Sequence, residues 1–189
     1  MIAECIQENY DKYSAFVILC GIETITYTGS VLSFLLENLQ KTVILTGALV
    51  PLSFMRNDAF TNILDSLILA GHFVIPEVLI VMDSKGFRAN RCRQLESDSF
   101  NSIDSPNFPA LVEFGINIEI KWQLVLRKGE EVFSEVDQKL QLSPEFVTDI
   151  VIVKITPFMK FEHFKHLIHT PNLRCLILEC YHFAEMPHS

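Results

Sequence analysis

The sequence predicts an α/β fold, with a Rossmann-like, mostly parallel sheet flanked by helices and the start of a smaller α/β domain near the C-terminus. Short apolar runs recur at Ala15–Gly21, Thr42–Gly47 and Glu77–Asp83. Continuous runs of this kind are typical of parallel strands that are buried on both faces. Stretches with helical spacing of apolar residues separate the runs, which favours crossover helices between parallel strands.

Two helices are expected between these strands. In the first, apolar residues crowd one broad face, as packing on a sheet requires. They are Val31, Leu32, Phe34, Leu35, Leu36 and Leu39. The second helix is expected from Met55 to about His72, and either Asn57 or Asp58 can cap its start. Its apolar residues recur at three- and four-residue spacing and are Phe60, Ile63, Leu64, Leu67 and Ile68.

The pattern changes after the third strand. Residues 86–109 are polar and are expected to form a long loop with one helical turn, and residues 116–126 alternate loosely as a β ribbon. We expect an N-terminal domain at residues 1–128, a linker at 129–148 and a partial C-terminal domain at 149–189. The expected elements of the last domain are a strand at Asp149–Ile155, a helix at Phe158–His169 and a strand at Leu173–Cys180.

Composition limits the classes of partner and site. A formal net charge of −8 provides no basic patch, which argues against nucleic acid and anionic membrane surfaces as partners. The apolar runs are far shorter than the ~20 residues that span a bilayer. The first residues do not resemble a secretory signal, so a cytoplasmic location is expected. The five cysteines form no CxxC pair and are expected to be free, buried thiols, with no metal site.

Several segments together resemble one known family. Thr26–Leu39 (TYTGSVLSFLLENL) and Lys41–Ala48 (KTVILTGA) are similar to the cytosolic, type I L-asparaginases. Agreement continues at Ile75–Val78, Phe87–Arg91 and Ser105–Asn107. The resemblance implies a Rossmann-like large domain followed by a smaller one. It also implies hydrolysis of L-asparagine to L-aspartate and ammonia without a cofactor.

The resemblance further implies two sets of catalytic residues, and this sequence departs from both. In the family, a threonine in a Gly-Gly-Thr-Ile-like motif attacks the side-chain amide. No such motif occurs in these 189 residues. The family's second set is Thr-Asp-Lys, and the matching positions here are Ile22, Glu23 and Gln94. Isoleucine has no hydroxyl group, and glutamine cannot carry the charge of lysine.

Other positions of the family's substrate pocket are retained. They are Gly21, Thr46, Gly47, Ala48 and Asp58. Each also has a purely structural interpretation. Glycine after a strand permits a tight turn, Thr46–Ala48 can simply end a strand, and Asp58 is more simply explained as a helix cap.

The sequence therefore predicts a shortened asparaginase-family protein that is catalytically inactive or severely impaired. It is expected to bind L-asparagine or a related small amino acid weakly, and to form homo-oligomers or pair with an intact relative. One alternative is a partial or spliced chain of a working cytosolic L-asparaginase whose nucleophile lies upstream. Another is a poorly folded fragment with an unpaired sheet edge at Ala15–Gly21 or Thr42–Gly47.

Overall fold

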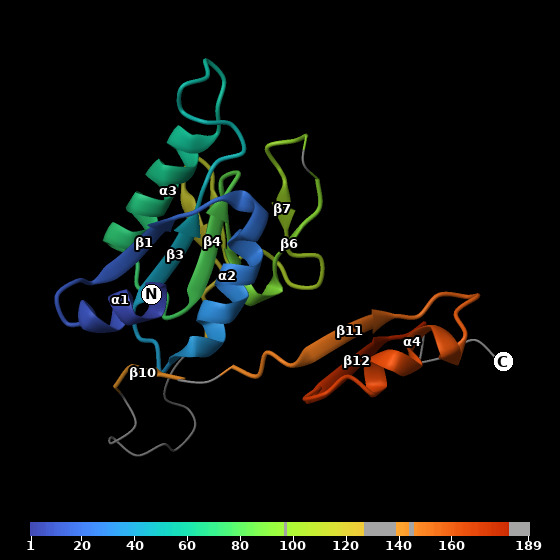
Figure 1. Cartoon of the computed structure of the whole chain (residues 1–189). Helices are drawn as coiled ribbons and strands as arrows, with labels where there is room; N and C mark the ends of the chain where they lie inside the picture. The colour runs from blue at the N-terminus through green and yellow to red at the C-terminus, as the bar shows by residue number, and fades with distance from the viewer. Residues whose placement is uncertain (97, 127–138, 144–145, 182–189) are drawn as a thin grey trace. The chain divides into compact units, whose positions relative to one another are not determined.

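The computed structural model describes residues 1–96, 98–126, 139–143 and 146–181 (Figure 1). The chain divides into two compact units, residues 1–143 and residues 144–189, which are considered separately. The first unit contains a six-stranded mixed sheet with helices on both faces, which confirms the predicted α/β fold.

The sheet has the strand order β1-β3-β4-β5-β8-β9. The three predicted strands are present as β1 (Ala15–Leu19), β3 (Thr42–Thr46) and β4 (Val78–Met82), and they pair in parallel. Every residue of β3 and β4 is buried, because both strands lie inside the sheet and are covered on both faces. β1 forms one edge of the sheet.

Three antiparallel strands extend the parallel part. They are β5 (Lys85–Arg88), β8 (Val112–Phe114) and β9 (Ile118–Ile120). β5 falls in the range that was expected to be a loop, so that expectation was wrong there. Asp83 and Ser84 have φ values of 49° and 54°, and this two-residue turn brings Lys85 back to pair with Met82. Positive φ at both central positions is the geometry of a tight hairpin turn, whose usual sequence is Asn-Gly or Asp-Gly, and here serine stands in place of the glycine.

The helices cover opposite faces of the sheet. α2 (Ile22–Leu35) packs on the face that carries Val43 and Leu45, together with a short helix, α1 (Ile2–Glu8), which the sequence had not indicated. α3 (Ala59–His72) packs on the face that carries Ile44.

This placement makes one crossover left-handed. α2 joins β1 to β3 and α3 joins β3 to β4, so both connections step in the same direction across the sheet. Two such connections with helices on opposite faces must have opposite hands. Parallel crossovers are right-handed in about 98% of cases. The left-handed connection among β1, β3 and β4 is therefore an unusual feature of this sheet.

The predicted helices differ from the observed ones in their bounds and in the faces they bury. α2 ends at Leu35, so two residues expected on its packed face lie outside it: Leu36 lies in β2 (Leu36–Glu37), and Leu39 follows that strand. Val31 and Phe34 are exposed rather than packed on the sheet.

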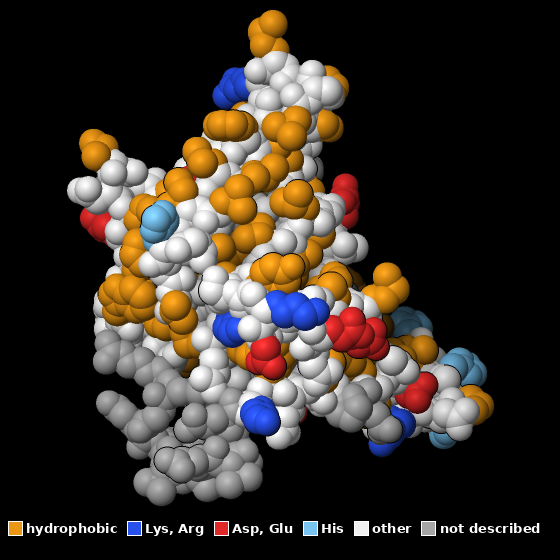
Figure 2. All heavy atoms as spheres, turned by 90° about the vertical axis from the view of Figure 1, so that its left-hand side faces the viewer, with side chains coloured by type: hydrophobic (Ala, Val, Ile, Leu, Met, Phe, Trp, Pro, Cys, Tyr) orange, Lys and Arg blue, Asp and Glu red, His pale blue; other side chains and the backbone are white. Residues whose placement is uncertain are grey.

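None of the five apolar residues whose spacing predicted α3 is fully buried. α3 begins at Ala59, and its residues Phe60, Leu64 and Leu67 are exposed. Figure 2 shows hydrophobic side chains gathered across the side of the molecule where α3 lies. The buried positions include Asn62 and Ser66, which are polar. The reason is a hydrogen-bond network under the helix, described below.

Shorter elements complete the first unit. They are a 3₁₀ turn, η1 (Ala89–Arg91), and the two-stranded pairs β6 (Arg93–Gln94) with β7 (Ile103–Asp104) and β2 with β10 (Gln141–Leu142). β10 falls within the range expected to be a linker. The remainder of that range includes residues 129–138 and 144–145, which lie outside the described residues.

The second unit contains the expected strand–helix–strand pattern. β11 (Ile150–Lys154) and β12 (Cys175–Glu179) pair in parallel, with α4 (Phe161–Ile168) between them in sequence. Residues 182–189 lie outside the described part. All five cysteines are free as expected, but none is fully buried: Cys5 and Cys175 are exposed, and Cys20, Cys92 and Cys180 are half-buried. No helix in the described residues has both the length and the apolar character needed to cross a bilayer.

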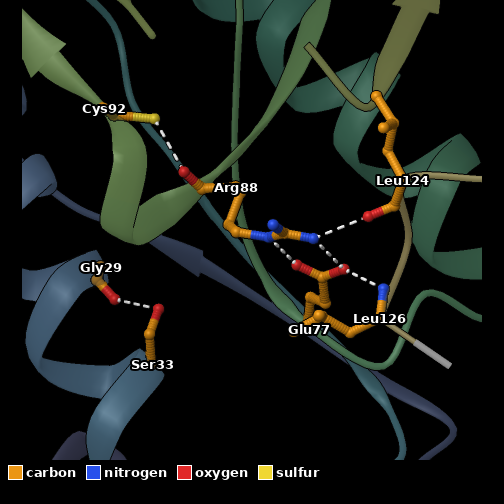
Figure 3. A network of polar contacts seen from close by, with 7 residues as sticks. All are labelled: Gly29, Ser33, Glu77, Arg88, Cys92, Leu124 and Leu126. Carbon is orange, nitrogen blue, oxygen red and sulfur yellow. Dashed lines mark hydrogen bonds and ion pairs between the residues drawn. The ribbon is translucent and has the colours of Figure 1, made fainter. Parts of the chain in front are cut away.

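A buried ion pair lies at the amino end of β4 (Figure 3). The Arg88 guanidinium donates to both carboxylate oxygens of Glu77, from Nε at 2.5 Å and from Nη2 at 3.0 Å. The side chains are only 12% and 3% exposed. The pair also holds the segment after β9, because Leu126 N donates to Glu77 at 2.7 Å and Arg88 donates to Leu124 O at 2.8 Å. One ion pair therefore joins β4, β5 and that segment.

We expect Glu77→Gln to lower the free energy of unfolding by ~3 kcal/mol or more, because it leaves the buried Arg88 charge unpaired. The matched control is Glu113→Gln, which breaks the exposed Glu113–Lys121 pair, with side chains 49% and 32% exposed. That change is expected to remove less than ~1 kcal/mol. Urea unfolding of both variants measures the difference, and equal losses would contradict a special role for the buried pair.

Candidate active site

The predicted site residues gather at the carboxyl ends of the parallel strands. Gly21 and Ile22 follow β1, and Thr46, Gly47 and Ala48 lie at the end of β3. Ligands of open α/β sheets bind in this region. The structure therefore brings the two segments to the same edge of the sheet.

Gly47 is in close contact with the chain that leaves β1. A Cβ atom at this position would lie 2.4 Å from the carbonyl oxygen of Cys20 and 3.3 Å from Cγ2 of Ile22. Cys20 N also donates to Thr46 O at 3.0 Å. Only glycine allows this approach, so Gly47 fixes the distance between the two site segments.

Ile22 is the first residue of α2 and belongs to the hydrophobic core. Its side chain is 6% exposed and packs in the cluster between α2 and the sheet. The sequence resemblance matches this position to the family's second catalytic threonine. In this chain the position holds an apolar side chain that faces the core and the Gly47 backbone.

Glu23 and Gln94 meet in a polar pocket of about 390 Å³ between α2 and β6. The other lining residues are Thr26, Tyr27, Ser30, Cys92 and Arg93. The four α2 residues, Glu23 included, follow i, i+3, i+4, i+7 spacing and therefore share one helix face. This spacing could have identified Thr26, Tyr27 and Ser30 from the sequence, but the pairing of that face with residues 92–94 is a tertiary contact.

The pocket holds few groups that could act in catalysis. Glu23 carries a negative charge in the first turn of α2, where the helix dipole favours it. Cys92 is a protonated thiol, because burial, followed by the negative charge of Asp104, raises its pKa to about 12. It donates to Arg88 O at 3.3 Å. A thiol in this state is not an activated nucleophile.

Asp58 and Asn62 connect the ends of β3 and β4. The Asp58 carboxylate accepts from Leu49 N and Val50 N, both at 3.0 Å. Although Asp58 is the N-cap residue of α3, its side chain makes no capping bond. The expectation that it acts mainly as a helix cap was therefore wrong. Its carboxylate instead shapes the loop that leaves β3.

Asn62 lies at the centre of this network and is 1% exposed. Its Nδ2 donates to Gly47 O and to Asp58 Oδ2, both at 3.0 Å, and its Oδ1 accepts from Asp83 N at 3.1 Å. One carboxamide thus satisfies groups after β3, at the start of α3 and after β4. The network holds the backbone of the retained pocket positions in place.

The described residues contain no group of three or more histidine, cysteine, aspartate or glutamate side chains that could hold a metal ion.

Comparison with known proteins identifies the family. Residues 1–126 match the family model described as "Asparaginase, N-terminal". This chain belongs to the asparaginase family. It is 36% identical over 186 residues to L-asparaginase 1 of Escherichia coli strain K12, which covers 98% of this chain and 53% of that protein. The asparaginase-family chain thus spans about half the length of this relative.

Two further comparisons agree. The human 60 kDa lysophospholipase is 37% identical over 166 residues, which covers 84% of this chain and 29% of that protein. The crystal structure of L-asparaginase I from Vibrio cholerae O1 biovar eltor str. N16961 superimposes with a TM-score of 0.87 at 34% identity, covering 100% of this chain and 55% of the other. The asparaginase fold therefore extends over the full chain.

Gly47→Ala is expected to lower the free energy of unfolding by ~2 kcal/mol or more, because the added methyl group would overlap the Cys20 carbonyl oxygen. Gly115→Ala is the matched control, since its Cβ would lie 3.5 Å from the nearest atom, the Asn117 carbonyl oxygen. The control should change stability by about 0.5 kcal/mol or less. Thermal and urea unfolding measure both values, and a tolerated Gly47→Ala would disprove the close approach.

A second prediction concerns the carboxamide network. Asn62→Leu keeps the approximate size of the side chain but leaves Asp83 N–H and Gly47 O without their partner. We expect a loss of ~2–5 kcal/mol, since each buried unpaired group costs ~1–3 kcal/mol. Asn57→Ala removes bonds at the exposed start of α3 and should cost ~1 kcal/mol. Amide hydrogen exchange provides a local readout, because the Asp83 amide should lose protection only in Asn62→Leu.

Proposed function

We propose that this asparaginase-family chain does not hydrolyse the side-chain amide of L-asparagine at an appreciable rate. The observation that carries the proposal is the buried, apolar side chain of Ile22 at the position that matches the family's second catalytic threonine. A side chain without a hydroxyl group can neither attack a carbonyl carbon nor transfer a proton.

Gln94 supports the same conclusion independently. It lines the pocket beside Glu23, where the matching family residue is a lysine. A neutral carboxamide cannot stabilise a threonine alkoxide as an ammonium group does. Loss of the nucleophile and its activator together lowers the rate by about as much as loss of one, on the order of 10⁴ to 10⁶ by analogy with other catalytic triads.

Substrate binding is proposed to be weak. The retained positions Gly21, Thr46, Gly47 and Ala48 offer a ligand mainly their backbone. The pocket that contains Glu23 is lined by none of these four residues, and its lining includes exposed side chains such as Arg93 and Gln94. We propose that L-asparagine or a related small amino acid binds no better than millimolar. We also propose that residues 149–189 belong to a second, smaller domain, which is supported by the N-terminal family model ending at residue 126 and by the separate compact unit at residues 144–189.

The alternative is that the chain is part of a longer working L-asparaginase. Ile22 and Gln94 lie inside the chain, so any longer form would also carry both substitutions. A Gly-Gly-Thr-Ile-type segment upstream would supply one threonine, but it would not restore the second set. The site therefore supports a protein that does not hydrolyse L-asparagine better than it supports a working L-asparaginase.

We expect no release of ammonia from L-asparagine above background. The triple substitution Ile22→Thr, Glu23→Asp and Gln94→Lys rebuilds the family's Thr-Asp-Lys set. This 189-residue variant should still release no ammonia, because no family-type attacking threonine is present in its sequence. The same three changes in a fusion that carries a family-type N-terminal segment should give measurable turnover. A coupled ammonia assay, with enzyme prepared from a host that lacks its own asparaginases, measures all three proteins.

Two controls make the outcome decisive. The fusion without the three substitutions should release no ammonia above background, which separates the effect of Ile22 and Gln94 from that of the added segment. Circular dichroism should be the same for all variants. Turnover by the unmodified chain would overturn the proposal, and turnover by the rebuilt chain without the added segment would mean that the attacking residue is wrongly assigned.

A further inference from the structure

A second pocket lies at the amino end of β4, at the opposite end of the parallel strands from the candidate active site. Its volume is about 260 Å³. Glu77, which directly precedes β4, and Ser33 of α2 line this pocket, and Figure 3 shows the two side chains on opposite sides of it. None of the described residues lines both this pocket and the pocket that contains Glu23. We refer to it as the β4 pocket.

The walls of the β4 pocket are apolar and belong to the hydrophobic core. Leu36, Leu39 and Val78 line it, and each of them is at most 9% exposed. All three lie in the core cluster between α2 and the sheet. Close-packed core side chains sit in fixed rotamers. The β4 pocket is therefore preformed, as small-molecule sites usually are.

The polar side of the β4 pocket has hydrogen-bonding capacity that the protein does not use. Arg88 lines the pocket, and its Nε and Nη2 groups donate to Glu77 and to Leu124 O. No hydrogen bond among the described residues uses Nη1, although the side chain is only 12% exposed. Ser33 Oγ donates to Gly29 O at 2.8 Å, so its lone pairs remain able to accept. The pocket thus offers unused donors at Arg88 and an unused acceptor at Ser33.

The buried ion pair favours a neutral ligand. Glu77 and Arg88 neutralise each other, and their side chains are 3% and 12% exposed. An anion in the β4 pocket would lie beside the Glu77 carboxylate, and a cation would lie beside the Arg88 guanidinium. Either ion would lose its hydration without gaining an unpaired partner of opposite charge, which is unfavourable. Neutral molecules of the same size do not carry this cost.

We propose that the β4 pocket binds a small neutral molecule that carries a carboxamide group on a short apolar body. The carboxamide oxygen accepts from Nη1 of Arg88, its N–H donates to Oγ of Ser33, and the body packs against the leucine and valine walls. A carboxamide matches the pocket because it combines an acceptor and donors in one neutral group.

Size and charge narrow the class of ligand further. The volume of the β4 pocket equals that of about nine water molecules at ~30 Å³ each, which limits the ligand to roughly ten non-hydrogen atoms. L-Asparagine has a carboxamide, but its α-ammonium and α-carboxylate groups are charged, so it does not meet the requirement. The proposal is therefore independent of whether the candidate active site binds L-asparagine.

Isobutyramide is the probe that tests the proposal, because isobutyrate and isobutylamine carry the same apolar body with a negative or a positive group. Two-dimensional ¹H–¹⁵N spectra of the labelled chain follow each titration near neutral pH. Isobutyramide should bind with a dissociation constant of about 1–10 mM, and each ion should bind at least about 10-fold more weakly. The Leu126 amide, which donates to Glu77, should shift, and the Cys20 amide at the carboxyl end of β1 should not.

Two serines on α2 provide a matched pair of variants. Ser33 and Ser30 are both half-buried, and they line the β4 pocket and the pocket that contains Glu23, respectively. Ser33→Leu removes the acceptor and fills part of the space, so it should weaken isobutyramide binding at least about 10-fold. Ser30→Leu should change the dissociation constant less than about 3-fold. Circular dichroism of both variants should match that of the unmodified chain.

Three outcomes would overturn the proposal. The first is the absence of any shift of the Leu126 amide at about 100 mM isobutyramide, roughly ten times the weakest expected dissociation constant. The second is equal weakening by Ser30→Leu and Ser33→Leu, which would place the probe outside the β4 pocket. The third is binding of isobutyrate or isobutylamine as tightly as isobutyramide, which would contradict the requirement for a neutral carboxamide.

Discussion

The carboxamide of Asn62 is the interaction on which the rest of this structure depends. It bonds to Gly47, Asp58 and Asp83, which follow β3, begin α3 and follow β4. An amide buried this deeply must have its donors and acceptor satisfied, because an unpaired buried polar group is expensive. The ends of β3 and β4 are therefore held at a fixed distance from α3, and the site segments with them.

This network also determines the orientation of α3. To reach the strand ends, the helix must turn Asn62 and Ser66 toward the sheet, and Ser66 Oγ in turn donates to Asn62 O at 2.7 Å. The residues on the opposite side of the helix, including Phe60, Leu64 and Leu67, then face outward. The exposed apolar face of α3 is thus a consequence of the polar network beneath the helix.

The contacts that hold the site segments in place do not depend on the side chains that would perform catalysis. Gly47 brings the ends of β1 and β3 together through backbone contact, and Asp58 shapes the loop after β3, without any requirement for catalytic side chains. The replacement of reactive groups that we propose at Ile22 and Gln94 therefore does not require any change in this framework. The backbone of this chain superimposes on L-asparaginase I of Vibrio cholerae with a TM-score of 0.87, as expected if the framework is retained.

The sequence by itself determined the three parallel strands, the α/β class and the positions that cluster at the strand ends, because continuous apolar runs and local spacing are properties of neighbouring residues. It did not show which face of α3 is buried, and it missed β5. Asn62 is held by partners 15 and 21 residues away, and β5 depends on a tight turn at Asp83 and Ser84 that lacks the usual glycine. Periodicity identifies an amphipathic helix but not which face meets the sheet. Only the tertiary structure decided that, since satisfying a buried carboxamide outweighed burying a few more apolar side chains.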